Sequence, residues 1–463
     1  MNAGGRRVPL YGWLTAQAIT LLGTRVSMIA IPWLVLTTTG SPTQTGLVAF
    51  AEIAPMVLFK AFGGPLVDRI GPRRVAINTD LLSFVVVGLI PLLHHTGVLT
   101  FPVLLGLVAL AGALRGPGDA ATTALIPALV ERAAVPYERA TGLSSAIERG
   151  ATMLGAAIAG GLVATVGAAN AVAVDATSFA LCALVLITTT RSLTHPTPES
   201  TGQGIGPSTP EHAEREDGSS TREPAGWEVA SSTADPSPQP GERGSSPSSS
   251  GPTTSYFVEL REGWTFLRRD PVLVSLCVMV AVTNLLDLAW SAVLLPVWAH
   301  DSGAGVGAVG LIFAVWGGAS MLGSVIAAAY GTRLPRFATY LVAFLITGLP
   351  RFLLFALGVP VWAILLMCVI GGVSSGFLNP VLGAVQFERI PRPMVGRVTA
   401  LTSALSWSLM PLGGVLGGLV ISGIGLSPAM LVIGLAYFAA TMAPALIPSF
   451  RGMNRQEREP VAA

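Results

Sequence analysis

Charged residues are scarce in this sequence. Of its 463 residues, 11% are Asp, Glu, Lys or Arg, whereas 51% are hydrophobic. A typical soluble chain is about 25% charged, so the composition excludes an ordinary soluble protein and predicts an integral membrane protein. The net charge of +2 is too small to indicate a nucleic-acid partner.

Cysteine and histidine are also few. Cys182, Cys277 and Cys368 each stand alone in an apolar run, which excludes a disulfide framework or a zinc spacing. His94 and His95 are adjacent but have no other ligand nearby in sequence, a pattern more typical of solvated side chains than of a metal site. The sequence also lacks a phosphate-binding loop for a nucleotide. We therefore expect no metal, no other cofactor and no enzyme activity.

Long apolar runs fill most of the chain. Roughly twelve of them reach the ~20 residues that a helix needs to cross a ~30 Å hydrocarbon layer. Gly and Pro lie inside these runs, which fits helices in lipid better than the short alternating strands of a barrel. We predict an all-α integral membrane protein with twelve transmembrane helices. The first run continues to about Thr37 without a small-residue cleavage site, so we expect it to be retained as a helix.

Arginine is unevenly distributed among the predicted turns. If the first helix starts in the cytoplasm, every turn on that side contains Arg. The turns on the opposite side, near residues 41, 94–100, 167–170, 300, 359 and 423, contain neither Lys nor Arg. This asymmetry follows the positive-inside rule. It predicts a multi-pass protein of the plasma or inner membrane with both termini in the cytoplasm.

One internal segment is hydrophilic. Residues 191–254 are rich in Ser, Pro, Gly, Thr and Glu, a composition that cannot bury enough apolar surface to fold. We predict a disordered cytoplasmic linker there. It separates a six-helix bundle in residues 1–190 from a second one in residues 272–450, and residues 451–463 are expected to form a cytoplasmic tail.

The residues directly after the linker have the spacing of an amphipathic helix. Residues 255–271 place four apolar side chains at helical intervals and two arginines at the end. The apolar side chains are Phe257, Leu260, Trp264 and Leu267. We predict a helix lying on the inner leaflet; a cytosolic extension of the seventh transmembrane helix is the alternative.

The two predicted bundles contain a repeat. The segment from Arg139 aligns without a gap with the segment from Arg397, at an offset of 258 residues (397 − 139). The matched positions include Arg, Thr and Ser, although a likeness of Ala/Gly/Leu-rich composition is the alternative explanation. Two such halves, related by an axis along the membrane normal, form a transporter plan with the substrate site between them. The glycines that we expect to serve close helix packing are Gly155, Gly160, Gly413 and Gly418.

The turn between the second and third predicted helices is densely charged. It reads GGPLVDRIGPRRV, residues 63–75, and resembles the signature of the major facilitator superfamily at the same turn. The matching residues are Gly64, Leu66, Asp68, Arg69, Gly71, Arg73 and Arg74. With the helix number, the central linker and the repeat, the resemblance covers the whole chain. It implies two six-helix pseudo-symmetric halves around a central cavity.

In that family the charged turn latches the cytoplasmic helix ends in the outward-facing state. Here Asp68 can pair with an arginine, and Arg73 and Arg74 can bind helix-end carbonyls or lipid phosphates. Asp119, toward the cytoplasmic end of the fourth predicted helix, is expected to join this latch. A role of the arginines as a topology signal alone is the alternative.

Three further stretches resemble a branch of the family that contains enterobactin exporters and macrolide efflux proteins. They read AIPWLVLTTTGSP, ELREGWTFLRRDPVL and GRVTALTSALSWSLMPLGGVLGGLV. This resemblance implies a secondary active transporter that exports amphipathic antibiotics, drugs or siderophores by alternating access, as a proton antiporter. We expect a cavity with apolar and aromatic lining and few fixed charges.

Two other hypotheses remain open from the sequence, and the second of them covers two functions. A proton-coupled symporter that takes up a small solute would have the same architecture. A membrane-embedded enzyme or a lipid flippase belongs to another class, and the absence of clustered Asp, His or Cys at a membrane face argues against the enzyme. We expect a monomer with a small-molecule substrate and lipid contacts, driven by the proton gradient.

Some charged residues fall within the predicted helices. A charge near the middle of a membrane helix costs about 2.5–3.5 kcal/mol on insertion scales, so such residues are functional candidates. Asp287 is the first candidate to carry a proton, because it lies near the centre of its apolar run without a basic neighbour in sequence. Glu52 is the second. A permanent structural pair of Asp287 with Arg351 is the alternative.

Two arginines complete the candidates for proton coupling. Arg115 falls where the family's fourth helix carries an arginine implicated in coupling, so its role is implied by the resemblance. Arg25 lies at a depth similar to that of Glu52, counted at about 1.5 Å per residue, and the two could form a buried pair. The other charged residues inside the predicted helices are Asp119, Glu148, Arg149, Asp175 and Arg351.

Overall fold

A computed structural model describes residues 3–135, 137–191, 256–330, 333–391, 394–448 and 450. These residues form helices and short turns. The predicted linker, apart from residue 191, and the predicted tail lie outside the described residues. The side chains of Asp68 and Arg397 and the surroundings of Gly64 also lie outside the described part.

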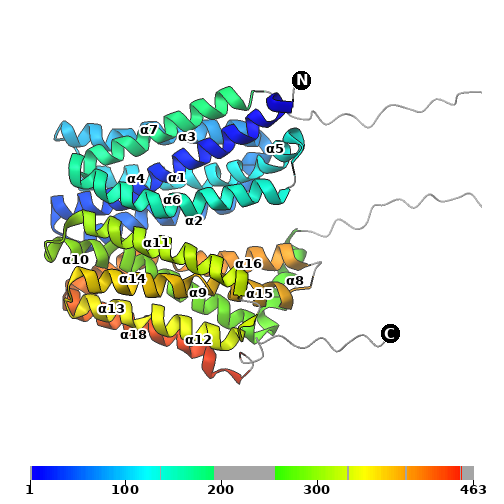
Figure 1. The fold of residues 1–463 in the computed structure, drawn as a ribbon. Coiled ribbons are helices and arrows are strands. Elements are labelled where there is room, and N and C mark those ends of the chain that lie inside the picture. The colour runs from blue at the N-terminus through cyan, green and yellow to red at the C-terminus, as the bar shows by residue number, and fades with distance from the viewer. Residues whose placement is uncertain are drawn as a thin grey trace, which may run out of the picture. The chain divides into compact units, whose positions relative to one another are not determined.

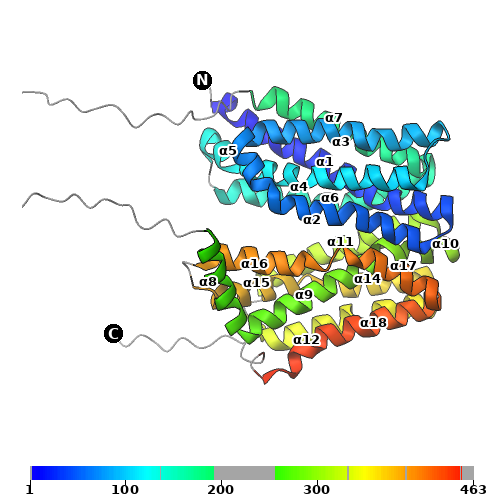
Figure 2. The same ribbon diagram turned by 180° about the vertical axis from the view of Figure 1, so that it is seen from behind.

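The chain divides into two groups of helices that pack side by side (Figures 1 and 2). The first half contains α1 (Ala3–Thr39), α2 (Pro42–Ile70), α3 (Pro72–His95), α4 (Phe101–Ala124), α5 (Ile126–Ala133), α6 (Tyr137–Val166) and α7 (Ala168–Thr189). The second half contains α8 (Tyr256–Arg269), α9 (Pro271–Ala289), the π-helical segment η1 (Trp290–Leu294), α10 (Leu295–Asp301), α11 (Gly305–Tyr330), α12 (Arg336–Thr347), α13 (Leu349–Ala356), α14 (Val361–Ser375), α15 (Leu378–Arg389), α16 (Val395–Ser408), α17 (Leu412–Ile424), α18 (Leu426–Met442) and the 3₁₀ turn η4 (Ala443–Leu446).

Eleven helical segments of the described residues are long and apolar enough to cross a membrane. Several of them join consecutive helices, as α9, η1 and α10 do in the span Pro271–Asp301. The helix α2, whose side chains at residues 61–65 lie outside the described part, is 29 residues long and packs along α4. With α2, the number of crossing segments equals the predicted twelve.

Glycine forms the turns at one end of the bundle. Each of the six turns there contains a glycine with positive φ, a conformation that a Cβ atom would strain. These glycines are Gly40, Gly97, Gly167, Gly303, Gly358 and Gly425. The turns contain no Lys or Arg, so we call this end, on the left in Figure 1, the arginine-free end. The opposite end, which holds the turn between α2 and α3, is called the arginine-rich end.

The repeat seen in the sequence makes the same helix contacts twice. Gly155 in α6 packs against α1, and its counterpart Gly413 in α17 packs against α9. Gly160 packs against α11, and its counterpart Gly418 packs against α2. In the repeat, α9 corresponds to α1 and α11 corresponds to α2, because they begin the first and second crossing segments of their half. Each pair of matched glycines therefore contacts a pair of matched helices. The two pseudo-symmetric halves predicted from the sequence are confirmed.

The halves touch closely at the arginine-free end. A Cβ atom on Gly46 in α2 would meet the backbone carbonyl of Gly414 in α17, and one on Gly310 in α11 would meet that of Ala156 in α6. Gly46 and Gly310 are 264 residues apart (310 − 46), and Ala156 and Gly414 are 258 apart (414 − 156). The same joint therefore occurs twice, and small residues let the helix backbones meet there.

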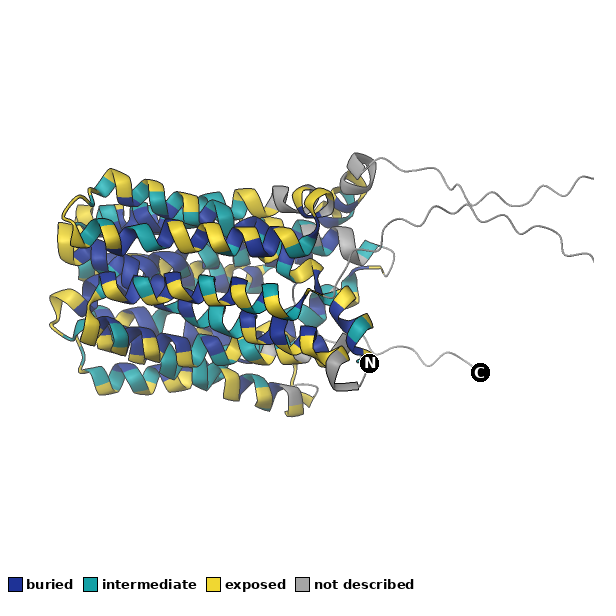
Figure 3. Ribbon diagram, turned by 90° about the horizontal axis from the view of Figure 1, so that it is seen from above, coloured by how far each residue is buried: buried dark blue, intermediate teal, exposed yellow. Residues whose placement is uncertain are grey.

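Apolar side chains fill the interior of both halves and the joint between them. The largest cluster of buried side chains runs from Leu34 and Val48 in the first half to Leu294 and Ile312 in the second. Figure 3 shows the buried residues concentrated toward the interior of the bundle. Large exposed apolar side chains, such as Leu435, belong on the surface of a protein that lipid surrounds.

The helix α8 is separate from α9. Asp270 lies between them, and its carboxylate accepts hydrogen bonds from the backbone N–H groups of Val272 and Leu273, which begins α9 as a new helix. Leu267 is buried against α9, whereas Trp264 is 44% exposed. The helix thus has a buried and an exposed side.

Replacement of Gly160 by valine is expected to weaken the joint between the halves. Gly160 contacts Gly310, whereas the adjacent Gly161 faces open space. Overpacking costs about 1–3 kcal/mol, so Gly160→Val should open the arginine-free end and Gly161→Val should not. The distance between α2 and α17 at this end can be followed at Thr43 and Ser422, because their hydroxyl oxygens lie 2.7 Å apart across the joint.

The measurement is the rate of disulfide formation in the Thr43→Cys/Ser422→Cys protein. We expect Gly160→Val to slow it by at least about fivefold and Gly161→Val to leave it unchanged. Equal rates in the two valine variants would contradict the conclusion that Gly160 packs between the halves.

Candidate functional site

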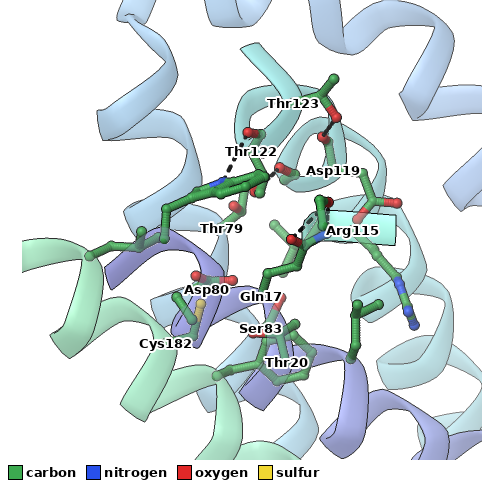
Figure 4. A pocket seen from close by; sticks show the side chains of 18 of the residues that line it. Gln17, Thr20, Thr79, Asp80, Ser83, Arg115, Asp119, Thr122, Thr123 and Cys182 are labelled. Carbon is green, nitrogen blue, oxygen red and sulfur yellow. Dashed lines mark hydrogen bonds between the residues drawn. The ribbon is translucent and has the colours of Figure 1, made fainter. Parts of the chain in front are cut away.

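A cavity of about 340 Å³ lies in the first half, toward the arginine-rich end. Its walls come from α1, α2, α3, α4, α6 and α7, and Figure 4 shows Asp80 beside Cys182 and, from α4, Arg115 and Asp119. The charged side chains that line it are Lys60, Asp80, Arg115, Asp119 and Glu148.

The cavity predicted from the sequence lies between the two halves and has few charges, whereas this cavity lies within the first half and has a charged lining. Four helices, α2, α3, α4 and α6, each turn at least one charged side chain toward the cavity. The sequence gives the depth of a residue in its helix, but the rotation of each helix decides which side chains share a wall.

Glu52 pairs with Arg115. The Glu52 Oε1 atom lies 4.0 Å from Arg115 Nη1, and both side chains are mostly buried. The close approach of α2 and α4 creates this pair: Cβ atoms on Gly112 and Gly116 would meet the backbone of Glu52 and Lys60. The two candidates for proton coupling are thus brought together by glycines between them.

Asp175 faces the same pair. It is 2% exposed and accepts hydrogen bonds from the hydroxyl groups of Ser27 and Ser178. A small pocket of about 30 Å³ is lined by Asp175, Glu52 and Arg115 together. Arg115 also lines the large cavity, so this arginine contacts both spaces.

Arg25 does not take the predicted place beside Glu52. Its Nη2 atom donates a hydrogen bond to Thr152 Oγ1 in α6 at 2.9 Å. A Cβ atom at position 155 in α6 would collide with the Arg25 side chain. Gly155 lacks this atom and so leaves room for Arg25. Arg25 therefore faces α6 while Glu52 faces α4, and the expected Arg25–Glu52 pair is wrong.

Asp287 forms an ion pair with Arg351. Arg351 is 8% exposed, and its guanidinium also lies against aromatic rings. The distances from Arg351 Cζ to the ring centroids are 5.0 Å for Trp290, 5.6 Å for Trp316 and 4.8 Å for Tyr437. The structure therefore has the pair that the sequence left as the alternative for Asp287.

The charged turn between α2 and α3 holds the end of α7. Arg73 Nε donates to Thr190 Oγ1 at 2.9 Å, and Arg73 Nη2 donates to the Ile187 carbonyl at 3.3 Å. This is the helix-end contact expected of Arg73. Gly71, with φ 92°, forms the turn itself. The side chains of Arg69 and Arg74 are exposed.

Asp119 contacts Lys60. The distance from Asp119 Oδ2 to Lys60 Nζ is 3.8 Å. The sequence predicted a partner in the charged turn, such as Arg73, whose donors go to α7 instead. Because Lys60 and Asp119 lie on the closely packed helices α2 and α4, they meet at the cavity wall rather than at the turn.

Lys60 and Asp80 were not predicted from the sequence, and Asp175 was not singled out among the charged residues inside the helices. Asp80 lies nine residues after Gly71, which is about 13 Å along α3. Both Asp80 and Lys60 could be taken for an extension of the charged turn. The number of residues between each of them and the turn could have indicated that they lie farther inside the membrane than the turn does.

Metal-ligating side chains do not gather in the part of the chain that the structure describes. No three His, Cys, Asp or Glu residues there form a group that could hold a metal ion. Cys182, Cys277 and Cys368 are buried and unpaired with one another. The candidate site is therefore built from charged and hydroxyl side chains.

Comparison with known proteins identifies the family. The model of the Major Facilitator Superfamily matches residues 13–292 and 277–461. The chain belongs to the major facilitator superfamily. The resemblance inferred from the charged turn is thereby confirmed, and this major facilitator protein is a member of a transporter family rather than of an enzyme family.

Relatives and solved structures agree with this membership. The multidrug efflux pump Tap of Mycobacterium tuberculosis is 27% identical over 451 residues, which cover 97% of this chain and 95% of Tap. Tap of Mycolicibacterium fortuitum is 24% identical over 454 residues, with 97% and 98% covered. The nucleoside transporter NupG has the same fold, with a TM-score of 0.66, 10% identity, and 98% and 99% of the chains covered.

Loss of the Asp287 charge is expected to destabilise this major facilitator protein. Asp287→Asn leaves a buried guanidinium without its counter-charge, which should lower the free energy of unfolding by about 3 kcal/mol. Arg351→Met leaves a carboxylate whose side chain is 42% exposed, so its effect should be smaller. Thermal unfolding of the purified variants measures both.

The double variant Asp287→Asn/Arg351→Met is the control. Because it removes both charges, it should recover most of the stability lost in Asp287→Asn. A double variant as unstable as Asp287→Asn would show that the pair does not account for the loss.

Proposed function

We propose that this protein is a proton-driven exporter of amphipathic small molecules. Multidrug efflux pumps are among its relatives along nearly the whole chain, which supports export over uptake. The cavity in the first half is the proposed substrate site. Access to it would alternate between the two sides of the membrane as the halves move relative to each other.

The observation that carries the proposal is the pocket where Glu52 and Asp175 share Arg115. With both carboxylates ionised, the pocket holds two negative charges and one positive charge in the membrane interior. The pocket then has a net charge of one negative unit, which is costly in the membrane interior. Binding of one proton to a carboxylate neutralises this net charge. The pocket is therefore a suitable proton site, with Glu52 or Asp175 as the group that carries the proton.

Contact between the pocket and the cavity supports exchange of proton and substrate. Ser83, Arg115 and Phe179 line both spaces. A change in the charge of the pocket is therefore felt by a molecule in the cavity through Arg115. A proton gained from one side of the membrane would favour release of the substrate there, and its loss would favour reloading on the other side.

The position of the cavity allows loading from the cytoplasm. The positive-inside rule predicts that the arginine-rich end faces the cytoplasm, and the cavity lies toward that end. An exporter loads its substrate from the cytoplasm. Close contact of the halves at the arginine-free end, as at Gly46 and Gly414, is what a loading state requires.

The test is retention of labelled compounds in cells that produce the protein. Macrolides, siderophores and cationic dyes form the panel, each measured with and without a protonophore. We expect lower retention that the protonophore reverses. Unchanged or raised retention across the panel would contradict export and favour proton-coupled uptake.

Neutral variants of the pocket test the proton site. Glu52→Gln and Asp175→Asn should each abolish protonophore-sensitive export while the protein still equilibrates substrate down its gradient. For a neutral substrate, exchange with one proton supplies about 2.3 kcal/mol per 100 mV, enough to maintain about a fiftyfold ratio of substrate concentrations across the membrane. The variants should lose this concentration ratio.

The exposed carboxylate Asp301, in the second half, provides the control. Asp301→Asn should export as the unchanged protein does. Full proton-driven export by both Glu52→Gln and Asp175→Asn would remove the pocket from the mechanism.

A further inference from the structure

The Lys60 ammonium lies between the two halves of the protein. Its Nζ atom is 3.8 Å from Asp119 Oδ2 in the first half and 5.8 Å from the ring centroid of Trp407 in the second half. The side chains of Lys60 and Asp119 are 54% and 47% exposed. The ammonium is thus held by a carboxylate and an indole face at a position open to the cavity.

A carboxylate beside an aromatic face is the arrangement that binds alkylammonium groups. The carboxylate supplies a charged acceptor, and the ring face attracts a cation within about 6 Å. Lys60 therefore shows, with its own side chain, that Asp119 and Trp407 form a site for an ammonium.

The charges of the cavity favour a further cation. Asp80, Asp119 and Glu148 line it together with Lys60 and Arg115. Arg115 is engaged by Glu52 in the adjoining pocket. Arg25 interacts electrostatically with Glu148. The three carboxylates still exceed the two positive charges available to them, those of Lys60 and Arg25, so an entering cation gains more than a neutral molecule of the same shape.

The repeat provides an internal comparison. Arg149 in α6 donates to Ser324 Oγ in α11 at 3.4 Å. Arg149 is the counterpart of Trp407 at the offset of 258 (407 − 149), and Ser324 is the counterpart of Lys60 at the offset of 264 (324 − 60). The two contacts between the halves are therefore equivalent by pseudo-symmetry. The contact at Arg149 joins a cation to a hydroxyl, and the contact at Lys60 joins a cation to a carboxylate and a ring.

We propose that the ammonium of an amphipathic amine replaces the Lys60 ammonium between Asp119 and Trp407. This proposal rests on the proposed function, because it takes the cavity as the substrate site. Lys60 then acts as a tethered competitor for amines: an amine must displace it, whereas a neutral molecule has no ammonium for the site and leaves Lys60 in place. Because Lys60 joins α2 to α16, its displacement also removes a contact between the halves when substrate loads.

Binding of two matched dyes tests the proposal. Dansylcadaverine carries an ammonium at neutral pH, and N-pentyl dansylamide is its analogue without the amine. Each is titrated by fluorescence against the full-length protein in lipid nanodiscs. Lys60→Met should raise the affinity for dansylcadaverine by about two- to fivefold, the size of a half-exposed ion pair or cation–π contact, and leave the analogue unchanged.

Variants of the other two residues complete the test. Asp119→Asn and Trp407→Leu should each lower the affinity for dansylcadaverine by a similar factor and spare the analogue. Lys60→Arg keeps the cation and should bind both dyes as the unchanged protein does. Arg149→Met is the matched control, because it removes a cation from the equivalent contact, and it should change neither affinity.

The proposal is overturned if Lys60→Met leaves the affinity for dansylcadaverine unchanged or lower. It is also overturned if Lys60→Met shifts both dyes equally, or if Arg149→Met produces the same gain. These titrations use no proton gradient, so their outcome is independent of the retention assay. Failure of export in cells would reject the proposed function, whereas failure of the dye selectivity would reject only the role of Lys60.

Discussion

Buried charge in this protein must be compensated inside a bundle that is otherwise apolar. The two halves differ in how many opposite charges surround each buried arginine. A charge without a partner is costly in the membrane interior. In the second half, Arg351 has Asp287 and several aromatic rings as partners. In the first half, Arg115 lies in one pocket with two carboxylates. Three ionisable groups therefore share one pocket in the first half, whereas the second half pairs one arginine with one carboxylate.

The two halves share a framework that supports this difference. Their matched glycines bring matched helices into contact, and the joint at the arginine-free end is made twice from the same elements. Close-packed interfaces have discrete arrangements rather than gradual ones. In the proposed transport cycle, the pseudo-symmetric framework moves as two bodies and the asymmetric charges favour one arrangement over the other.

Much of the fold could be predicted from the sequence because its signals are local. Apolar runs, the glycine-containing turns and the uneven placement of arginine each depend on a short stretch of chain. The repeat was visible because it preserves polar positions as well as small ones. Arg73 was also predicted to bind a helix end, since the charged turn brings it close to neighbouring helix ends.

The site could be predicted only in part. Glu52 and Arg115 were both singled out, but Glu52 was expected beside Arg25, and Lys60 and Asp80 were missed. Counting residues along each helix placed Arg25 and Glu52 at a similar depth, yet depth does not say which helix a side chain faces. A difference of one residue rotates a side chain by about 100° around the helix axis. The partner is therefore fixed by packing.

The sequence by itself determined that this is a twelve-helix membrane protein with two related halves, because hydropathy and repetition are properties of the chain. Only the tertiary structure decided which charges share a pocket and which line the cavity. The reason is that glycines such as Gly112 and Gly155 set how closely, and at what rotation, each helix meets its neighbour.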